Sequence, residues 1–273
     1  VRITRTSPES VGAQQANAFV WDTYTSIIDE KFGRPNTALV GIQADALNFG
    51  SSIPQRSYLV DLLQVRIPSN YNPFTHVYTG QWDGTWQVAW SNNPAWCFYD
   101  LCTNERYGLG TALGALVPDK WELYEIAQYC DGSVPDGFGG TEPRFTFNGL
   151  IQTREQAQSV LAAMASTFRG AMWWGPAGVR VTQDRPSDPV ALYTAANVID
   201  GEFNRSGVSI EAIHTVALVA WNDPDDFYRK KIEYIEDQAG IAKYGVLEAE
   251  IAAYGCTSRG QARRLGLWTL YTE

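Results

Sequence analysis

The hydrophobic pattern of the chain is densest from Trp82 to Gly110, a stretch that holds four of the ten Trp residues. Trp86, Val88 and Trp90 occupy alternate positions, which is the spacing of one face of a strand. Asn93 and Pro94 follow, and this pair is typical of a helix start. An Asn side chain accepts from the first free backbone N–H groups, and Pro lacks only an N–H that has no partner there. The pattern predicts a strand and then a helix from Pro94 to Asn104.

Residues 1–80 have the pattern of strands rather than helices. Short apolar runs, separated by turn residues, predict strands at 1–5, 23–28, 38–44 and 56–68. The last run is apolar on both faces, so we expect it to be a central strand of a sheet. Asp61 is the exception within it, and a hydrogen-bonded or rim position is a commoner role for such a residue than catalysis.

Helical patterns appear after residue 81. Asp119 and Glu122 have the spacing of a capping box, which satisfies free N–H groups at a helix start. The following apolar positions recur at i, i+3, i+4 and i+7 and predict one buried stripe. The stripe consists of Leu123, Ile126, Ala127 and Cys130.

The stretch from 131 to 183 reads as a loop, a short strand, a helix and a hairpin. Gly and Pro residues predict a long loop at 131–144, and 144–148 reads as a short strand. Thr153 and Gln156 form a second capping box ahead of a helix that ends before Gly170. Two short runs, 171–174 and 178–183, predict a hairpin.

Residues 184–273 return to strands and end in a helix. Strands are predicted at 213–221, 227–235 and 247–251. Ser258 and Gln261 cap a final helix with Arg263 and Arg264 on its outward face. The whole pattern favours an α+β fold in which a β scaffold, residues 1–80 and 184–273, is interrupted by an inserted α/β region, residues 81–183.

Composition and charge argue against a nucleic-acid-binding protein and against a membrane-spanning one. The chain has 273 residues, is 45% hydrophobic and 19% charged, and has a formal net charge of −9. This balance argues against sequence-independent binding of nucleic acid, which needs a basic surface. No apolar run approaches the roughly 18 residues of a membrane span. Because the chain begins at Val1, without an initiator Met, and ends within a helical pattern, we expect a fragment of a longer protein.

No catalytic, cofactor-binding or metal-binding residue is expected. The four Cys residues have neither a disulfide-rich nor a zinc-ribbon spacing, so we expect reduced thiols. His76 and His214 are the only His residues, and neither has the sequence signature of a nucleophile nearby. The glycines of residues 108–114 miss the dinucleotide fingerprint by one residue. The acids of residues 223–226 lack the Gly and distal Glu of a calcium loop, so a turn is favoured.

Eight segments resemble, in collinear order and over essentially the whole chain, the tip attachment (host-specificity) protein J family of lambda-like long-tailed phages. These segments are IPQRSY (53–58), VRIPSNY (65–71), TGQWDGTW (79–86), WSNNPAWC (90–97), RYGLG (106–110), QYCDGSVPDGFGGTEPRFTFN (128–148), QDRPSD (183–188) and GCTSRGQA (255–262). The match is to an internal part of that family, ahead of its fibronectin-like and receptor-binding regions.

The resemblance implies a structural virion protein rather than an enzyme. It implies a hub-type β-barrel similar to a tail-tube barrel, interrupted by the insertion, within a homotrimer that closes the tail tube. The partners it implies are other tail-tip and tail-tube proteins, DNA that passes through the lumen without specific binding, and a host receptor contacted by regions outside this chain. It places the protein in the virion tail tip, assembled in the bacterial host cytoplasm.

Two alternatives remain open at this point. With ten Trp residues, a carbohydrate-active tail enzyme would need two acids in a cleft near exposed Trp. A binding module for host polysaccharide is the third possibility. The hub interpretation instead expects buried Trp residues, which would fix the insertion against the barrel.

Overall fold

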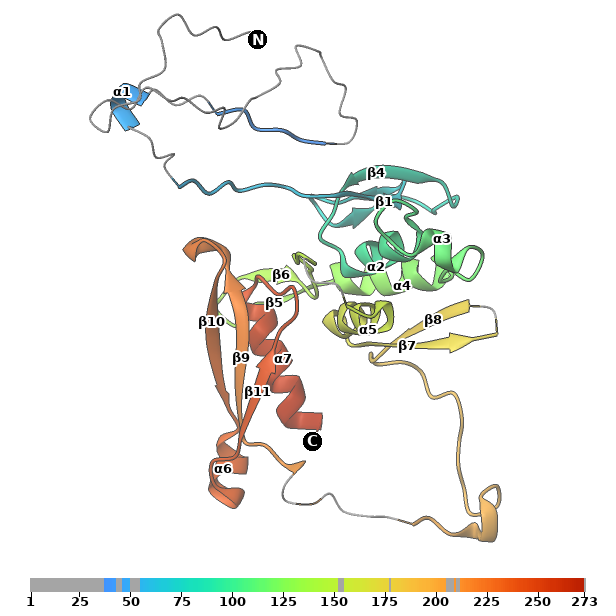
Figure 1. Ribbon diagram of the computed structural model, residues 1–273. Coiled ribbons are helices and arrows are strands. Elements are labelled where there is room, and N and C mark those ends of the chain that lie inside the picture. Colours follow the sequence, from blue (N-terminus) through green and yellow to red (C-terminus); the bar gives the residue numbers. More distant parts are fainter. Residues whose placement is uncertain are drawn as a thin grey trace, which may run out of the picture. The chain divides into compact units, whose positions relative to one another are not determined.

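The computed structural model describes residues 37–42, 46–49, 55–151, 155–176, 178–204, 209 and 212–272 (Figure 1). The chain divides into two units, Val1–Tyr58 and Leu59–Glu273. Helix α1 (Ala46–Phe49) belongs to the first unit. The strands predicted at 1–5 and 23–28 lie outside the described residues. The strand predicted at 38–44 is wrong for the residues described there, because 38–42 form no strand and are exposed.

The long central strand predicted at 56–68 is also wrong. Strand β1 covers only Gln64–Pro68 and pairs antiparallel with β4 (Trp86–Trp90), with Gln64 opposite Trp90. Beyond Trp90 the chain turns into a helix, so β4 offers no partner for anything before Gln64. Residues 55–63, including Asp61, therefore form no strand and are exposed.

The helices predicted around the Trp-rich stretch are confirmed. Helix α2 (Pro94–Thr103) begins after Asn93, whose Oδ1 accepts from the N–H of Ala95 at 3.0 Å. Short helix α3 (Gly110–Leu113) follows. Helix α4 (Lys120–Asp131) begins after Asp119, whose carboxylate accepts from the N–H of Trp121 at 2.7 Å. The predicted stripe of α4 is buried as expected.

The predicted loop at 131–144 contains a hairpin instead. Strand β5 (Ser133–Pro135) pairs with β6 (Thr141–Pro143), and the tip between them uses Gly137 and Gly139 at φ of 84° and 100°. Positive φ is a conformation that Gly adopts without a steric penalty, so the glycines that suggested a loop build a turn. The strand predicted at 144–148 is wrong, because these residues form no strand.

The helix and hairpin predicted next are confirmed. Helix α5 (Ala157–Thr167) begins after Gln156, and the N–H groups there receive no side-chain cap from it. Thr153, the first residue of the predicted capping box, lies outside the described residues. Strands β7 (Gly170–Gly175) and β8 (Gly178–Gln183) form an antiparallel hairpin.

The C-terminal part is a three-stranded sheet with a helix packed on it. Its order is β10-β9-β11, from β9 (Val216–Asp223), β10 (Arg229–Glu236) and β11 (Glu248–Ala252). Strand β11 runs parallel to β9, so the chain crosses over through α6 (Gln238–Tyr244). Helix α7 (Arg259–Thr272) packs against the sheet. The remaining short elements are β2 (Tyr71–Asn72), β3 (Val77–Tyr78), η1 (Ile199–Gly201) and η3 (Pro224–Asp226).

The prediction that Arg264 lies on the outward face of the final helix is wrong. Arg264 lies against the β5–β6 hairpin, where Nη1 is 2.5 Å from Glu142 Oε1 and Nη2 donates to the carbonyl of Arg144 at 2.9 Å. A guanidinium has five donors, so one side chain can serve both a carboxylate and a carbonyl.

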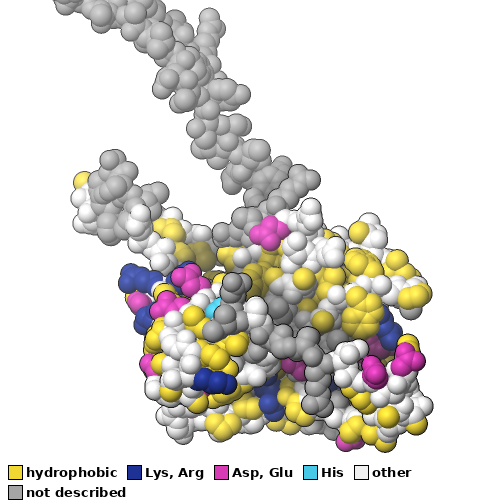
Figure 2. Space-filling view, turned by 90° about the horizontal axis from the view of Figure 1, so that it is seen from below, with side chains coloured by type: hydrophobic (Ala, Val, Ile, Leu, Met, Phe, Trp, Pro, Cys, Tyr) yellow, Lys and Arg dark blue, Asp and Glu magenta, His cyan; other side chains and the backbone are white. Residues whose placement is uncertain are grey.

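The buried apolar side chains form two clusters. The first, from Val65 to Val181, joins β1, α2, α4 and α5 and contains Trp82 and Trp96. The second joins β9, β10 and α7. Many further hydrophobic side chains reach the surface between the charged ones on the face that Figure 2 shows.

The barrel and the three-part division of the chain stay predictions. Among the described residues the sheets have two or three strands, and none closes into a barrel. No described helix has the length and apolar character needed to cross a membrane.

Candidate functional site

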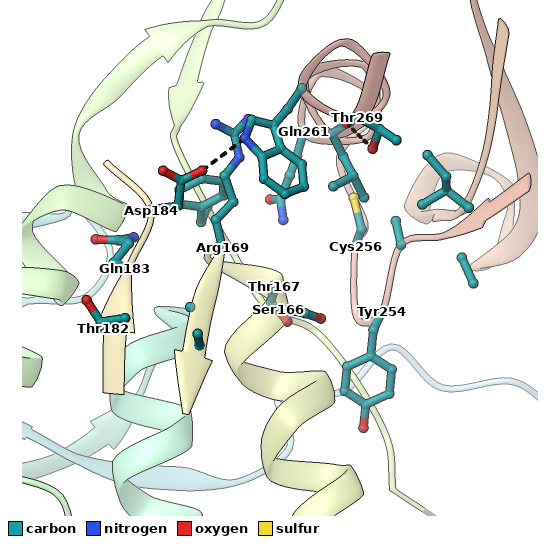
Figure 3. A pocket seen from close by; sticks show the side chains of 18 residues that line it. Ser166, Thr167, Arg169, Thr182, Gln183, Asp184, Tyr254, Cys256, Gln261 and Thr269 are labelled. Carbon is teal, nitrogen blue, oxygen red and sulfur yellow. Dashed lines mark hydrogen bonds between the residues drawn. The ribbon is translucent and has the colours of Figure 1, made fainter. Parts of the chain in front are cut away.

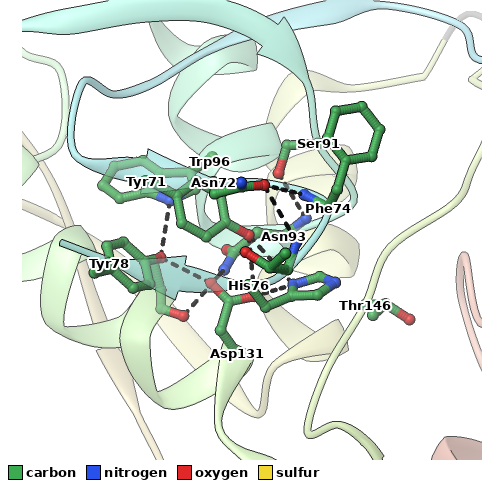
Figure 4. Close-up of polar contacts among 12 residues, drawn as sticks. Tyr71, Asn72, Phe74, His76, Tyr78, Ser91, Asn93, Trp96, Asp131 and Thr146 are labelled. Atoms are coloured by element: carbon green, nitrogen blue, oxygen red, sulfur yellow. Dashed lines mark hydrogen bonds and ion pairs between the residues drawn. The ribbon is translucent and has the colours of Figure 1, made fainter.

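A buried carboxylate, Asp131, gathers polar side chains from three elements (Figure 4). Tyr78 OH donates to it at 2.8 Å and Asn93 Nδ2 at 2.7 Å, while His76 Nδ1 lies 2.6 Å away. Tyr71 OH also donates, at 3.2 Å. The Asp131 side chain is 3% exposed. Four donors on two oxygens leave little acceptor capacity for a substrate.

The surroundings of this carboxylate suit a structural role. Burial, and then the negative charge of Asp131, raise the pKa of Tyr71 and of Tyr78, so both hydroxyls stay protonated as donors. Asn93 is also the N-cap of α2, and Asp131 is the last residue of α4. The network therefore ties β2, β3 and both helices together.

Sequence reasoning missed this cluster, although one signal pointed to it. An acid at a helix C-terminus faces the negative end of the helix dipole and is unfavourable there unless it is compensated. Asp131 follows the buried stripe of α4 directly, so it had to be both near the core and paired. The aromatic donors Tyr71 and Tyr78 have no such local signal, because the pairing of β2 with β3 brings them there.

The two His residues lie in different settings. His76 adopts φ of 57° and belongs to the Asp131 network. His214 lies just ahead of β9 and is half-buried. Within the described residues no Ser side chain hydrogen-bonds to His76 or Asp131, so they do not form a nucleophile–base pair with a Ser.

The glycines at 108 and 110 allow a close backbone approach. A Cβ at Gly108 would lie 2.3 Å from the carbonyl oxygen of Leu101, and one at Gly110 would lie 2.4 Å from that of Thr103. The turn after α2 therefore packs directly on the last turn of that helix. This is a structural role, consistent with rejecting a phosphate-binding loop.

The acids at 223–226 form a turn, as favoured from the sequence. Asp223 accepts from the N–H of Asp225 at 3.0 Å at the start of η3, and Lys231 Nζ lies 2.5 Å from Asp223 Oδ2. This hydrogen bond to Lys231 holds the pKa of Asp223 below its usual range. Within the described residues no group of three or more His, Cys, Asp or Glu side chains is placed to hold a metal ion.

The four Cys thiols form no disulfide and are shielded from solvent. Burial raises the pKa of Cys97 and of Cys102 to about 12 and that of Cys256 to about 11. Burial also raises the pKa of Cys130 well above its usual value. Because the thiolate is the reactive form, these residues pack as small apolar side chains.

A concave feature of the described residues is an apolar cleft of about 570 Å³ (Figure 3). One wall comes from the end of α5 and the β7–β8 hairpin, including Ala171 and Thr182. The other comes from β11, the segment after it and α7, including Ile251, Leu265 and Trp268. We call this feature the Arg169 cleft, after the cation that it contains.

Arg169 is held between aromatic rings in this cleft. Its guanidinium carbon lies 5.0 Å from the ring centre of Trp268 and 5.5 Å from that of Phe145. Nη2 donates to the carbonyl of Arg264 at 3.4 Å, and Nε is buried without a hydrogen-bond partner. Desolvation lowers the pKa of Arg169. One donor of this cation thus lacks a partner in largely apolar surroundings, and the nearby charge of Asp184 favours the charged form.

The cleft has a single carboxylate, Asp184, among its described lining residues. Its Oδ2 already accepts from Trp268 Nε1 at 3.1 Å. Glycoside hydrolysis requires a pair of carboxyl groups about 5–10 Å apart across the scissile bond. The lining of the Arg169 cleft does not supply that pair.

Comparison with protein families finds that the C-terminal part is similar to a family of phage tail proteins. The family model Phage-tail_3, described as a phage tail protein, matches residues 156–273. The matched range runs from the residue before α5 to the end of the chain and includes most of the lining of the Arg169 cleft.

Comparison with curated proteins covers the whole chain. It is 38% identical over 273 residues to a protein of Escherichia phage SECphi27, and 36% identical over 274 residues to one of Escherichia phage SECphi4. Both proteins are named tip attachment protein J. All of this chain is covered in each case, but it spans 23% and 24% of the two relatives.

Proposed function

Because this chain is homologous over its full length to phage tip attachment proteins J, we propose that it is part of a structural protein of a phage tail tip. The observation that carries the proposal is the match along all 273 residues to two such proteins. The phage tail family that matches residues 156–273 supports the same assignment. The resemblance seen in the sequence is confirmed by these comparisons.

The proposed mechanism is mechanical rather than catalytic. The chain would contribute to a central hub that closes the tail tube, joins the tube to the receptor-binding region and lets DNA pass. Its partners would be other tail proteins, with a homotrimer as the assembly. Each chain would contribute a hub barrel from residues 1–80 and 184–273, interrupted by the inserted region. The net charge of −9 supports passage of DNA without adhesion, because like charges repel a polyanion.

Immunoelectron microscopy of virions tests this proposal. Antibodies raised against the 273-residue chain are expected to label intact virions at the end of the tail that is distal to the capsid. Antibodies against the main tail-tube protein, which should label along the tail, are the control for access. Label on the capsid, or no label on virions from cells that produce the protein, would contradict a tail-tip role.

The alternative of a carbohydrate-active enzyme gains no support from the described residues. The Trp residues with the most packing, Trp82 and Trp96, are buried in the first cluster. Trp121, Trp173 and Trp174 are exposed, yet none of them lines the Arg169 cleft.

A further inference from the structure

We propose that the Arg169 cleft binds the segment Asp188–Phe203 of a second copy of this chain. The segment lies between β8 and β9 and contains η1 (Figure 1). This inference rests on the self-association in the proposed function and names a contact between copies, but crosslinking of the isolated chain can fail while antibodies still label the tail tip.

The cleft calls for a ligand with apolar side chains and negative charge. Its lining is mainly apolar, and one donor of Arg169 lacks an acceptor. Desolvation lowers the pKa of Arg169, the charge of Asp184 raises it, and the charges of Arg264 and Arg144 lower it. Three cations thus lie near one lining carboxylate in a protein of net charge −9. An incoming carboxylate would restore favourable electrostatics for a cation that is now poorly solvated.

The segment Asp188–Phe203 has the complementary composition. It carries three acids, Asp188, Asp200 and Glu202, and no Lys or Arg. Its large apolar side chains are exposed, which costs free energy until something covers them. These side chains are Val190, Leu192, Tyr193, Ile199 and Phe203.

The segment is also shaped in advance for insertion. Asn197 Oδ1 accepts from the N–H of Thr194 at 2.7 Å, and its Nδ2 donates to the carbonyl of Leu192 at 2.8 Å. These bonds fix a turn that displays the apolar side chains. A turn that is ordered before binding loses less entropy when it binds.

Each copy carries both the segment and the cleft, so the contact can repeat from one copy to the next. Gln183 and Asp184 line the cleft, and the segment begins shortly after them. When a segment of one copy enters the cleft of the next, two different surfaces meet, and such a head-to-tail contact closes into a ring if the rotation permits. A cleft of about 570 Å³ holds only a few side chains, so this contact alone is expected to be weak.

Photocrosslinking with isotope labelling tests the proposal directly. A ¹⁵N-labelled 273-residue chain carrying p-benzoylphenylalanine in place of Leu192 is mixed with unlabelled chain, irradiated and analysed by mass spectrometry. The expected products join a labelled segment peptide to an unlabelled peptide from 166–171 or 251–269. With unlabelled chain in large excess, products that join only labelled peptides would show contact within one chain and overturn the proposal, as would products that map away from the cleft.

Two variants separate binding from folding. Ala171→Trp fills the cleft from an exposed strand position and is expected to lower the yield of mixed-label crosslinks at least 10-fold. Val246→Trp places the same side chain at an exposed site outside the lining and should leave the yield unchanged. Arg169→Gln should also reduce the yield, while circular dichroism confirms folding. An unchanged yield in a folded Ala171→Trp chain would refute docking at this cleft.

Discussion

Segments 82–99 and 55–63 are both rich in large apolar residues, but they end in opposite environments. In the first, Trp82 is 3% exposed and Trp96 is fully buried. In the second, Leu59 is 81% exposed and Leu63 is 57% exposed. Apolar content is therefore a poor guide to burial within this chain.

The two segments differ in burial because they have different neighbours. The ring centres of Trp82 and Trp96 lie 6.1 Å apart, and Tyr124 of α4 stacks on Trp82 at 5.0 Å. Segment 55–63 continues from β1, whose partner β4 stops at Trp90. Residues 55–63 therefore have no strand beside them to pair with, and their apolar side chains stay exposed. Such exposed surface is a mark of contact with other proteins.

The largest expected effect is at the centre of the buried segment. Trp96→Ala should lower the free energy of unfolding of the 273-residue chain by about 3–5 kcal/mol, because it leaves a large cavity in the first cluster. Urea unfolding followed by circular dichroism measures this change. Trp96→Phe should cost less, since most of the ring remains. A loss below about 1 kcal/mol for the Ala variant would mean that the aromatic core does not hold this region together.

A smaller loss of unfolding free energy is expected when Asp131, the centre of the buried polar network, is substituted. Asp131→Asn keeps one carbonyl oxygen but turns an NH₂ group toward donors, so buried donors lose their acceptor. The cost should be about 1–3 kcal/mol in the same unfolding assay. Glu105→Gln, at an exposed acid, is the matched control and should stay within about 0.5 kcal/mol of the parent. Equal effects of the two variants would show that the hydrogen bonds to Asp131 do not stabilise the fold.

A pH-dependent effect is expected outside both segments, at the end of β9. The pKa of Asp223 is lowered in the folded state by Lys231. Its stabilisation is thus present above the unfolded-state pKa, near the ordinary value of 3.8, and is lost as pH falls through the lower folded-state value. Thermal unfolding between pH 5 and pH 2 should show a steeper loss of stability in the parent than in Asp223→Asn. Parallel curves would argue against the Asp223–Lys231 pair.

The smallest effect is expected in the exposed segment. Leu59→Ala should change the free energy of unfolding by less than about 0.5 kcal/mol, because the side chain buries little. Ile67→Ala, a few residues along the chain but fully buried in β1, is the matched comparison and should cost about 2–5 kcal/mol. A large loss for Leu59→Ala would show that this segment is covered within the chain after all.

Helix starts and several strands could be predicted from the sequence, including those of the β7–β8 hairpin and of β9, β10 and β11. The extent of a strand and long-range polar contacts could not. Asn93 and Asp119 cap helices as predicted, because a cap needs only its own neighbours. The prediction of a strand over residues 56–63 was wrong because the apolar pattern there carries no information about where β4 ends. The outward placement of Arg264 was wrong for a similar reason, because its acceptors lie in and just after a hairpin more than 100 residues earlier in the chain.

The candidate sites divide in the same way. Helical spacing alone placed Cys130 in the core, and its burial and raised pKa agree. The Asp131 network and the Arg169 cleft need residues from separate elements, so no window of sequence displays them. The family resemblance was readable because long collinear segments carry it, and it needed no tertiary contact.

The parallel pairing of β11 with β9 has a consequence for the order of folding. Strands β9 and β10 are joined by a short turn and can pair as soon as both exist, on a timescale of about 1–10 μs. Strand β11 must first wait for α6 to cross over, and α7 has a complete surface to pack on only after that. We expect pulsed hydrogen exchange to protect the amides of β10 before those of β11. During synthesis, the last strand and helix would therefore dock onto a hairpin that is already formed.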